Sequence, residues 1–100
     1  LSPAELQTVC GFFQSKGPTA FSPVAITPDD LGGYWKDGKV QRPMLVHYNG
    51  EAFGRADTDI DMTFNFLQLI EHVTKSRNLG PGTIIGSGTI SNYDRSRGSS

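Results

Sequence analysis

Apolar residues recur with a helical period in the second half of the chain. In DMTFNFLQLIEHVTKSR, residues 61–77, apolar side chains stand at i, i+4, i+7, i+8 and i+11, namely Met62, Phe66, Leu69, Ile70 and Val73. This spacing places them on one face of an α-helix. Asp59 and Asp61 suit the positive N-terminal end of the helix dipole, and Gly80 and Pro81 follow its end. We therefore predict one well-packed helix over about 61–77.

Turn signals divide the middle of the chain into two β-hairpins. Asp37-Gly38 lies inside segment 35–40, and Asn49-Gly50 divides segment 44–56. Asn-Gly suits a two-residue type I′ turn because both of its positions require positive φ, and Asp-Gly is a similar hairpin signal. Short strands are also predicted at 23–26 and 83–85.

Capping signals predict two short helices in the first third of the chain. Ser2, Pro3 and Glu5 are typical of a helix start, in a helix that ends by Gly11. Segment 27–33, TPDDLGG, has a threonine cap, a proline, two acids and a double-glycine stop. With the hairpins, these elements predict an α+β fold dominated by β-structure.

Composition excludes several classes of partner. The 100 residues predict a single domain, and 36% hydrophobic with 19% charged residues is ordinary for a globular protein. A net charge of −1 argues against nucleic acid or an anionic membrane as a partner. No apolar run approaches the roughly 20 residues of a membrane span. Cys10 is the only cysteine and no signal peptide is visible, so we expect a cytoplasmic protein.

The glycine-rich stretch PGTIIGSGTISNYD, residues 81–94, is the most distinctive motif. It lacks the third glycine and the following helix of a dinucleotide fingerprint, and no Gly-Lys-Ser/Thr follows as in a P-loop. By spacing alone a strand-ending turn is the simpler interpretation, with a nucleotide-binding turn as the weaker alternative. DTDID, residues 57–61, begins like a calcium loop, but Met62 and Gln68 stand where glycine and glutamate are required.

Single reactive side chains are few. Neither His47 nor His72 has a second ligand at metal-binding spacing, and Cys10 lies beside no obvious base. Lys16 lies in a glycine- and proline-bounded loop between phenylalanines. A lysine held there can position a carboxylate or an enolate as a point charge, although composition alone favours a solvated loop lysine.

Three stretches in this order resemble the fumarylacetoacetate hydrolase family over roughly residues 12–91. FFQSKGPTAFSPVAITPDDLG is similar to the family's Gly-Lys-Ser-Phe and Thr-x-Asp-Glu-Leu segment. VHYNGEAFGRADTDIDMTFNFLQLIEHVT resembles its Asn-Gly-Glu hairpin and following helix start. LGPGTIIGSGTIS resembles its Leu-x-Pro-Gly-Asp-Ile-Ile-x-x-Gly-Thr turn.

The resemblance implies a metal-dependent hydrolase that cleaves a C–C bond next to a ketone. Substrates of the family are small 2-oxo or 1,3-diketo acids, such as fumarylacetoacetate or acylpyruvates, often in the catabolism of aromatic compounds. A divalent ion, Mg²⁺, Mn²⁺ or Ca²⁺, stabilises the enolate-like charge that develops. Decarboxylases and isomerases belong to the same family. The implied fold is a mixed β-sandwich roll, commonly assembled as a homodimer.

The resemblance also implies roles for individual residues. Lys16 matches the family's lysine at the substrate end of the pocket, with Ser15 before it and Gly17-Pro18 after it in place of the usual neighbours. Thr89 matches a threonine that contacts substrate, and Gly88 a glycine that lets substrate approach. Thr19 is carried over as a substrate-binding residue only weakly, because it lies one position early.

Several functional residues of the family have no counterpart here. The family's metal-binding carboxylates precede this region, so we expect the metal ligands to lie upstream of Leu1. The acid-base histidine also belongs to an upstream loop, and a catalytic glutamate would follow the Gly-Thr turn, beyond Ser100.

We therefore expect residues 1–100 to be the C-terminal portion of a catalytic domain. On this interpretation the chain contains no metal ligand and no assigned catalytic residue, is inactive alone and has an exposed apolar seam where the rest of the domain packs. The alternative is a non-catalytic binding or assembly module with the same fold.

Overall fold

The computed structural model describes Ala4, Gln7 and residues 16–98 of the chain. In order, these residues form α3 (Pro28–Leu31), η1 (Gly32–Tyr34), β1 (Trp35–Lys36), β2 (Lys39–Val40), β3 (Pro43–Tyr48), β4 (Glu51–Asp57), α4 (Phe66–Thr74) and η2 (Arg95–Arg97). The predicted α+β class with dominant β-structure is confirmed. The helix predicted over 2–11 lies, except for Ala4 and Gln7, outside the described residues.

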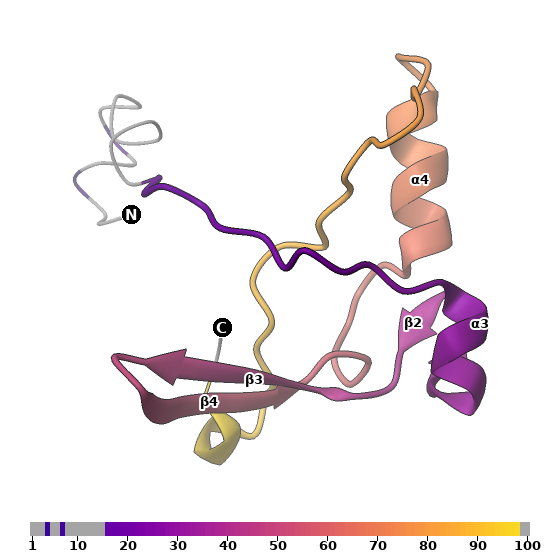
Figure 1. Ribbon diagram of the computed structural model, residues 1–100. Coiled ribbons are helices and arrows are strands. Elements are labelled where there is room, and N and C mark those ends of the chain that lie inside the picture. The colour runs from indigo at the N-terminus through magenta and orange to yellow at the C-terminus, as the bar shows by residue number, and fades with distance from the viewer. Residues whose placement is uncertain (1–3, 5–6, 8–15, 99–100) are drawn as a thin grey trace.

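Both predicted hairpins form with the turns that their sequences indicate (Figure 1). β1 pairs antiparallel with β2, and Asp37 and Gly38 have φ values of 54° and 70°. β3 pairs antiparallel with β4, and Asn49 and Gly50 have φ values of 51° and 81°. The β3–β4 register shifts between Val46 and His47, which marks a β-bulge.

The strands belong to two separate sheets of two strands each. Within the described residues these sheets close into neither a barrel nor a sandwich, so the roll that the resemblance implies is not completed by them. The strands predicted at 23–26 and 83–85 are not formed. Thr83 instead closes a turn, since its amide and hydroxyl both donate to the Gly80 carbonyl, at 3.3 and 2.7 Å. Pro23 brings no N–H group to a ladder.

Capping side chains set where the helices begin. In α3, Asp30 accepts from the Thr27 backbone N–H at 3.2 Å, and Gly32 follows with φ 56°, as predicted. α4 begins at Phe66 and not at residue 61, because Asp61 has φ 64° and Asn65 forms a reciprocal capping box with Gln68 at 2.9 Å in both directions.

The apolar stripe of α4 lies on its less exposed side, and Trp35 stacks near Phe66 with ring centroids 6.3 Å apart. Few side chains are covered completely, however. Ala56 is the one buried hydrophobic residue among those described, while Phe53 is 66% and Leu45 60% exposed. The radius of gyration of 15.7 Å exceeds the roughly 13 Å of a compact 100-residue domain. The described chain is thus open, and many of its large apolar side chains are exposed.

No helix within the described ranges is long and apolar enough to cross a membrane. Figure 1 shows α4 and the β3–β4 hairpin in different parts of the molecule, joined by the segment that follows β4. The C-terminal segment returns from α4 to the hairpin and ends in η2 beside β4. This return brings the glycine-rich turn and the acidic loop after β4 to one region.

Candidate functional site

Asn92 joins the C-terminal segment to the end of β4. Its side-chain Oδ1 accepts from the Asp57 backbone N–H at 2.9 Å, and its Nδ2 donates to the carbonyls of Asp57 and Ile60, both at 3.1 Å. Asn92 is only 9% exposed. A buried amide that satisfies three backbone groups holds both segments in one geometry, because each lost bond would leave a polar group unpaired.

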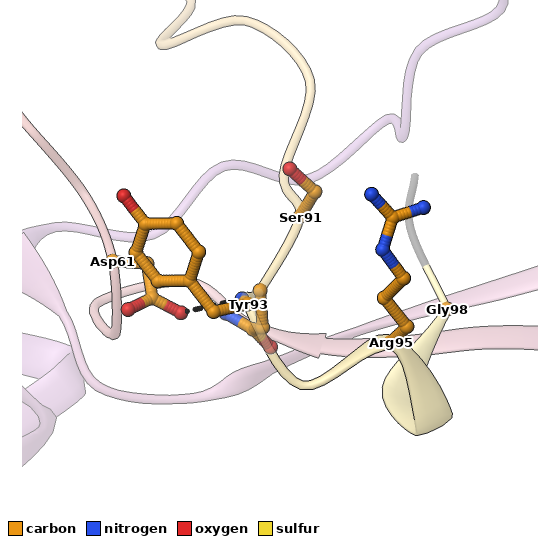
Figure 2. A pocket seen from close by; sticks show the side chains of 6 residues that line it. Asp61, Ser91, Tyr93, Arg95 and Gly98 are labelled. Carbon is orange, nitrogen blue, oxygen red and sulfur yellow. Dashed lines mark hydrogen bonds between the residues drawn. The ribbon is translucent and has the colours of Figure 1, made fainter.

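Further contacts made by residues after Asn92 strengthen this junction. The Asp61 carboxylate accepts from the Tyr93 backbone N–H at 3.0 Å (Figure 2). Arg97 forms an ion pair with Asp57 at 2.7 Å. Gly98 packs against β4, where an added Cβ would lie 3.2 Å from the Gly54 Cα. The segment from Ser91 to Gly98 is therefore fixed at both ends.

Asp94 caps η2 between these anchors. Its Oδ1 accepts from the Ser96 hydroxyl at 2.7 Å and from the Ser96 backbone N–H at 3.1 Å. These two bonds, assisted by the nearby Arg97 guanidinium and opposed by desolvation, hold the pKa of Asp94 below its ordinary value. The sequence predicted a loop here, although Asp94 before Ser96 and Gly98 after Arg97 are turn signals.

The loop after β4 is also held from the side of the first hairpin. The Thr58 hydroxyl contacts the carbonyls of Val40 and Arg42, the second at 2.9 Å, and the Thr58 N–H donates to the Arg42 carbonyl at 3.1 Å. The Lys39 ammonium donates to the Met62 carbonyl at 3.4 Å. The loop 57–62 is therefore a junction between the first hairpin and the C-terminal segment.

Two cavities open on this junction and share Asp61 and Ser91 in their walls. One, of about 570 Å³, is lined by Asp61, Ser91, Asn92, Tyr93, Arg95 and Gly98. The other, of about 290 Å³, lies between the loop and the glycine-rich turn and includes Thr89, Ser87, Thr58 and Phe64 in its lining. Together they have the size and the mixed polar lining of a site for a small molecule.

Of the four sequence-predicted site residues, Thr89 is the one that lines either of these cavities. Thr89 is exposed and lines the smaller cavity. Gly88 adopts φ 83°, and a Cβ added there would meet no atom within 4 Å, so the space above it is open. Lys16 and Thr19 are exposed and line neither cavity, so the described residues do not bring them together with Thr89.

A divalent metal ion does not fit the part of the chain that the structure describes. No group of three His, Cys, Asp or Glu side chains within it could hold one. Asp57 already pairs with Arg97, and Asp61 accepts from Tyr93. No step of the chemistry below is therefore assigned to a metal held by these residues.

The positions of the metal ligands stay a prediction. The carboxylates expected upstream of Leu1 lie outside the described residues, and so does Leu1 itself, so the structure does not test where they are. His47 in β3 and His72 in α4 lie on separate elements and line neither cavity at the junction. Neither histidine therefore takes the place of the expected ligands at this site.

Sequence reasoning did not identify Asn92 or Arg95 as residues of this region. Asn92 acts on backbone groups 35 and 32 positions earlier, so no local pattern announces it. Arg95 lies in a polar stretch whose composition indicates only a loop. The position of Thr89, in contrast, follows from the glycine-rich motif itself.

Comparison with known proteins places this sequence in a family. The family profile described as fumarylacetoacetate (FAA) hydrolase C-terminal matches residues 3–99, which include the glycine-rich turn, the loop after β4 and η2. A search among curated proteins found no match. Because the profile covers nearly the whole chain, the protein belongs to the fumarylacetoacetate hydrolase family.

Proposed function

We propose that this chain is part of a hydrolase that cleaves a C–C bond next to a ketone in small 2-oxo or 1,3-diketo acids. Fumarylacetoacetate and acylpyruvates are the substrate types in question. The observation that carries this proposal is the position of Thr89, which lies in the family's glycine-rich turn and lines a cavity. The open space above Gly88 supports it, because a substrate can approach the backbone there.

The chemistry assigns distinct tasks to the residues of the site. Breaking a C–C bond beside a ketone leaves enolate-like negative charge on the ketone oxygen. Hydrogen-bond donors that are already aimed at this oxygen stabilise the transition state more than the substrate. Thr89 is proposed to donate its hydroxyl to the substrate, and Gly88 keeps the approach open. Lys16 is proposed to add a positive charge, and Thr19 is proposed as a further substrate-binding residue.

A divalent ion, Mg²⁺, Mn²⁺ or Ca²⁺, is proposed for the intact protein on the basis of family membership. Bound beside the oxo-acid group, it would act as a Lewis acid that neutralises part of the developing charge. Its ligands are expected among carboxylates upstream of Leu1. A homodimeric assembly and a cytoplasmic location are likewise proposals for the intact protein.

Turnover of acylpyruvate by the intact protein tests this function. We expect hydrolysis that depends on Mg²⁺ or Mn²⁺, and a loss of tenfold or more in kcat for Lys16→Ala, comparable to the loss of one charge-stabilising donor. Lys36→Ala, another exposed lysine, serves as the matched control and should leave kcat unchanged. Unchanged turnover in Lys16→Ala would refute the role of Lys16, and absence of any turnover would refute the function.

Analysis of the products separates hydrolysis from the other reactions of the family. A hydrolase releases two carboxylic acids or a carboxylic acid and a ketone, whereas a decarboxylase releases CO₂ and an isomerase releases neither. A decarboxylated product would therefore replace the proposed reaction with the alternative one.

A non-catalytic binding or assembly module is the second candidate function. It is favoured by the altered neighbours of Lys16, which are Ser15 and Gly17-Pro18. The intact protein would then turn over no oxo acid under any metal condition. Calorimetric titration of the 100-residue chain with Mn²⁺ should detect no sub-micromolar site under either candidate function. A sub-micromolar site would show that metal ligands lie within residues 1–100, contrary to the prediction that they lie upstream of Leu1.

A further inference from the structure

The two hairpin turns share one chemistry but differ in their packing. In Asp37-Gly38 and in Asn49-Gly50, a side-chain carbonyl carbon precedes a glycine that has no side chain to shield its backbone nitrogen. Gly38 is buried, and its carbonyl accepts from the Phe66 N–H at 2.8 Å. Asn49 and Gly50 are exposed, and a Cβ added to Gly50 would meet no atom within 4 Å. Of the two turns, the second therefore has room to change its conformation.

The tip of the β3–β4 hairpin is held by few contacts. Because of the β-bulge, two residue pairs, His47↔Ala52 and Tyr48↔Glu51, lie between the bulge and the turn. All residues from 47 to 53 are exposed. Figure 1 shows this turn at the end of the hairpin that lies away from α4. Exposed segments with few contacts open locally at a low cost in free energy, so the turn can rearrange without unfolding the hairpin.

A rotation of one peptide plane brings two atoms of this turn together. Asn49 and Gly50 have φ values of 51° and 81°, the pattern of a type I′ turn. A five-membered ring that joins the Gly50 nitrogen to the Asn49 Cγ requires ψ of Asn49 near −120°, which with a positive φ is roughly the first central position of a type II′ turn. Types I′ and II′ both match the twist of hairpin strands. The rotation therefore prepares ring closure while the strands stay paired.

We propose that Asn49-Gly50 is a site of spontaneous deamidation through a succinimide. The Gly50 nitrogen loses its proton and attacks the Asn49 Cγ, the bond from Cγ to Nδ2 breaks, and ammonia leaves with the proton. One water molecule then opens the ring. Attack at Cγ leaves an ordinary aspartate, whereas attack at the main-chain carbonyl carbon leaves an isoaspartate, linked to Gly50 through its side chain. This inference is independent of the proposed function.

The isoaspartyl product changes the turn in two ways. It adds the Cβ of residue 49 to the main chain, so the loop no longer has the length of a two-residue turn. It also adds one negative charge beside Glu51 in a chain whose net charge is −1. The pair Tyr48↔Glu51 directly flanks the turn and should be the first to be lost. The junction at the other end of β4 lies beyond the bulge.

The other described asparagines lack one or more of these features. The buried Asn92 amide is bound to three backbone groups, and Asn65 caps α4 in its box with Gln68. Asn78 is exposed, but Leu79 follows it, and the leucine side chain hinders attack by the backbone nitrogen. Asn78 is therefore an internal control that shares the exposure of Asn49 but not its glycine.

Incubation of the intact protein in mildly alkaline, oxygen-labelled water tests the proposal. Peptide mapping by mass spectrometry should show aspartate and isoaspartate at position 49, each with one labelled oxygen from the water. Half of Asn49 should be converted before conversion of Asn78 is detectable. The rate should rise with hydroxide concentration, because the deprotonated nitrogen is the attacking group. Conversion of Asn49 that is absent, or no faster than that of Asn78, would overturn the site.

Two variants locate the charge change. Asn49→Gly removes the amide and keeps a Gly-Gly pair that suits a type I′ turn, so the more acidic species seen by ion exchange should disappear. Asn78→Ala is the matched control and should form this species at the wild-type rate. An equal amount of acidic species in Asn49→Gly would refute the assignment. Isoaspartate at Asp37 as abundant as at residue 49 would refute the role of packing, because that turn could close the same ring with loss of water.

Discussion

Gly38 and Gly88 have similar backbone conformations but opposite surroundings. Their φ values are 70° and 83°, a region in which only glycine is free of steric cost. At Gly38 an added Cβ would lie 3.0 Å from the Leu67 Cγ and 3.1 Å from the Asn65 Cγ. At Gly88 it would meet nothing within 4 Å. One glycine is enclosed by the protein, and the other faces empty space.

The difference separates a glycine that is enclosed by packing from one with open space around it. Gly38 also accepts from the Phe66 N–H at 2.8 Å, so the first hairpin and the start of α4 meet at this point. Around Gly88 the described residues provide no comparable packing. The glycine-rich turn is instead anchored by Asn92 and the residues that follow it. The space at Gly38 therefore serves packing, whereas the space at Gly88 is open, as its proposed role in substrate approach requires.

The largest expected effect is that of Gly38→Ala on stability. A left-handed alanine costs about 1–2 kcal/mol, and overpacking against Leu67 and Asn65 adds a similar amount, so the free energy of unfolding should fall by about 3 kcal/mol. Urea denaturation of the intact protein measures this. Gly33→Ala is the control, because Gly33 lacks positive φ and has open space, and it should change stability little. A tolerated Gly38→Ala would remove the distinction between the two glycines.

Asn92→Ala should have the next largest effect on stability, because the glycine-rich turn around Gly88 is anchored to β4 through Asn92. The substitution leaves the N–H and carbonyl of Asp57 and the carbonyl of Ile60 without their partner, which should lower the free energy of unfolding by about 2 kcal/mol. Asn78→Ala, at an exposed asparagine after α4, should be nearly neutral. Equal free energies of unfolding for Asn92→Ala and Asn78→Ala would show that Asn92 does not anchor the C-terminal segment.

Gly88→Ala should affect function more than stability. The conformational cost alone is about 1 kcal/mol, because no atom opposes the new methyl group. The same methyl group enters the space assigned to substrate, so kcat/KM should fall by more than stability explains. Gly86→Ala, without positive φ, is the control and should leave the free energy of unfolding within about 0.5 kcal/mol. Normal kcat/KM in Gly88→Ala would place the substrate elsewhere.

The smallest expected effect concerns Asp94 and acid. Since the folded state holds the pKa of Asp94 below its ordinary value, the carboxylate stabilises η2 above that ordinary value and loses this contribution as the pH falls through the lowered pKa. The Ser96 amide resonance should therefore shift with a midpoint below the ordinary pKa of aspartate, about 4. In Asp94→Asn this titration should vanish. A midpoint at or above the ordinary value would show that the cap does not form.

Local signals predicted the parts of the molecule that depend on neighbouring residues. Asp37-Gly38 and Asn49-Gly50 specified two hairpin turns, and Thr27 with Asp30 specified the start of α3, because each geometry is decided within four residues. Thr89 was predicted from the family resemblance and lines a cavity, and the substrate-binding roles of Lys16, Thr19, Gly88 and Thr89 all remain predictions. The helical period of α4 was read correctly, but its start was placed five residues early.

Contacts between distant segments decided the rest. The period of α4 continues to Met62, but Asp61 turns towards Tyr93 with φ 64°, and the helix can begin only where Asn65 caps it. Asn92 has no local signature, because its three partners belong to a strand end and loop more than 30 positions away. The sequence alone determined the hairpin turns, the cap of α3 and the family motif. Only the tertiary structure determined that the C-terminal segment is fastened to β4 and that Arg95 faces a cavity, since both depend on backbone groups that the chain brings together by folding.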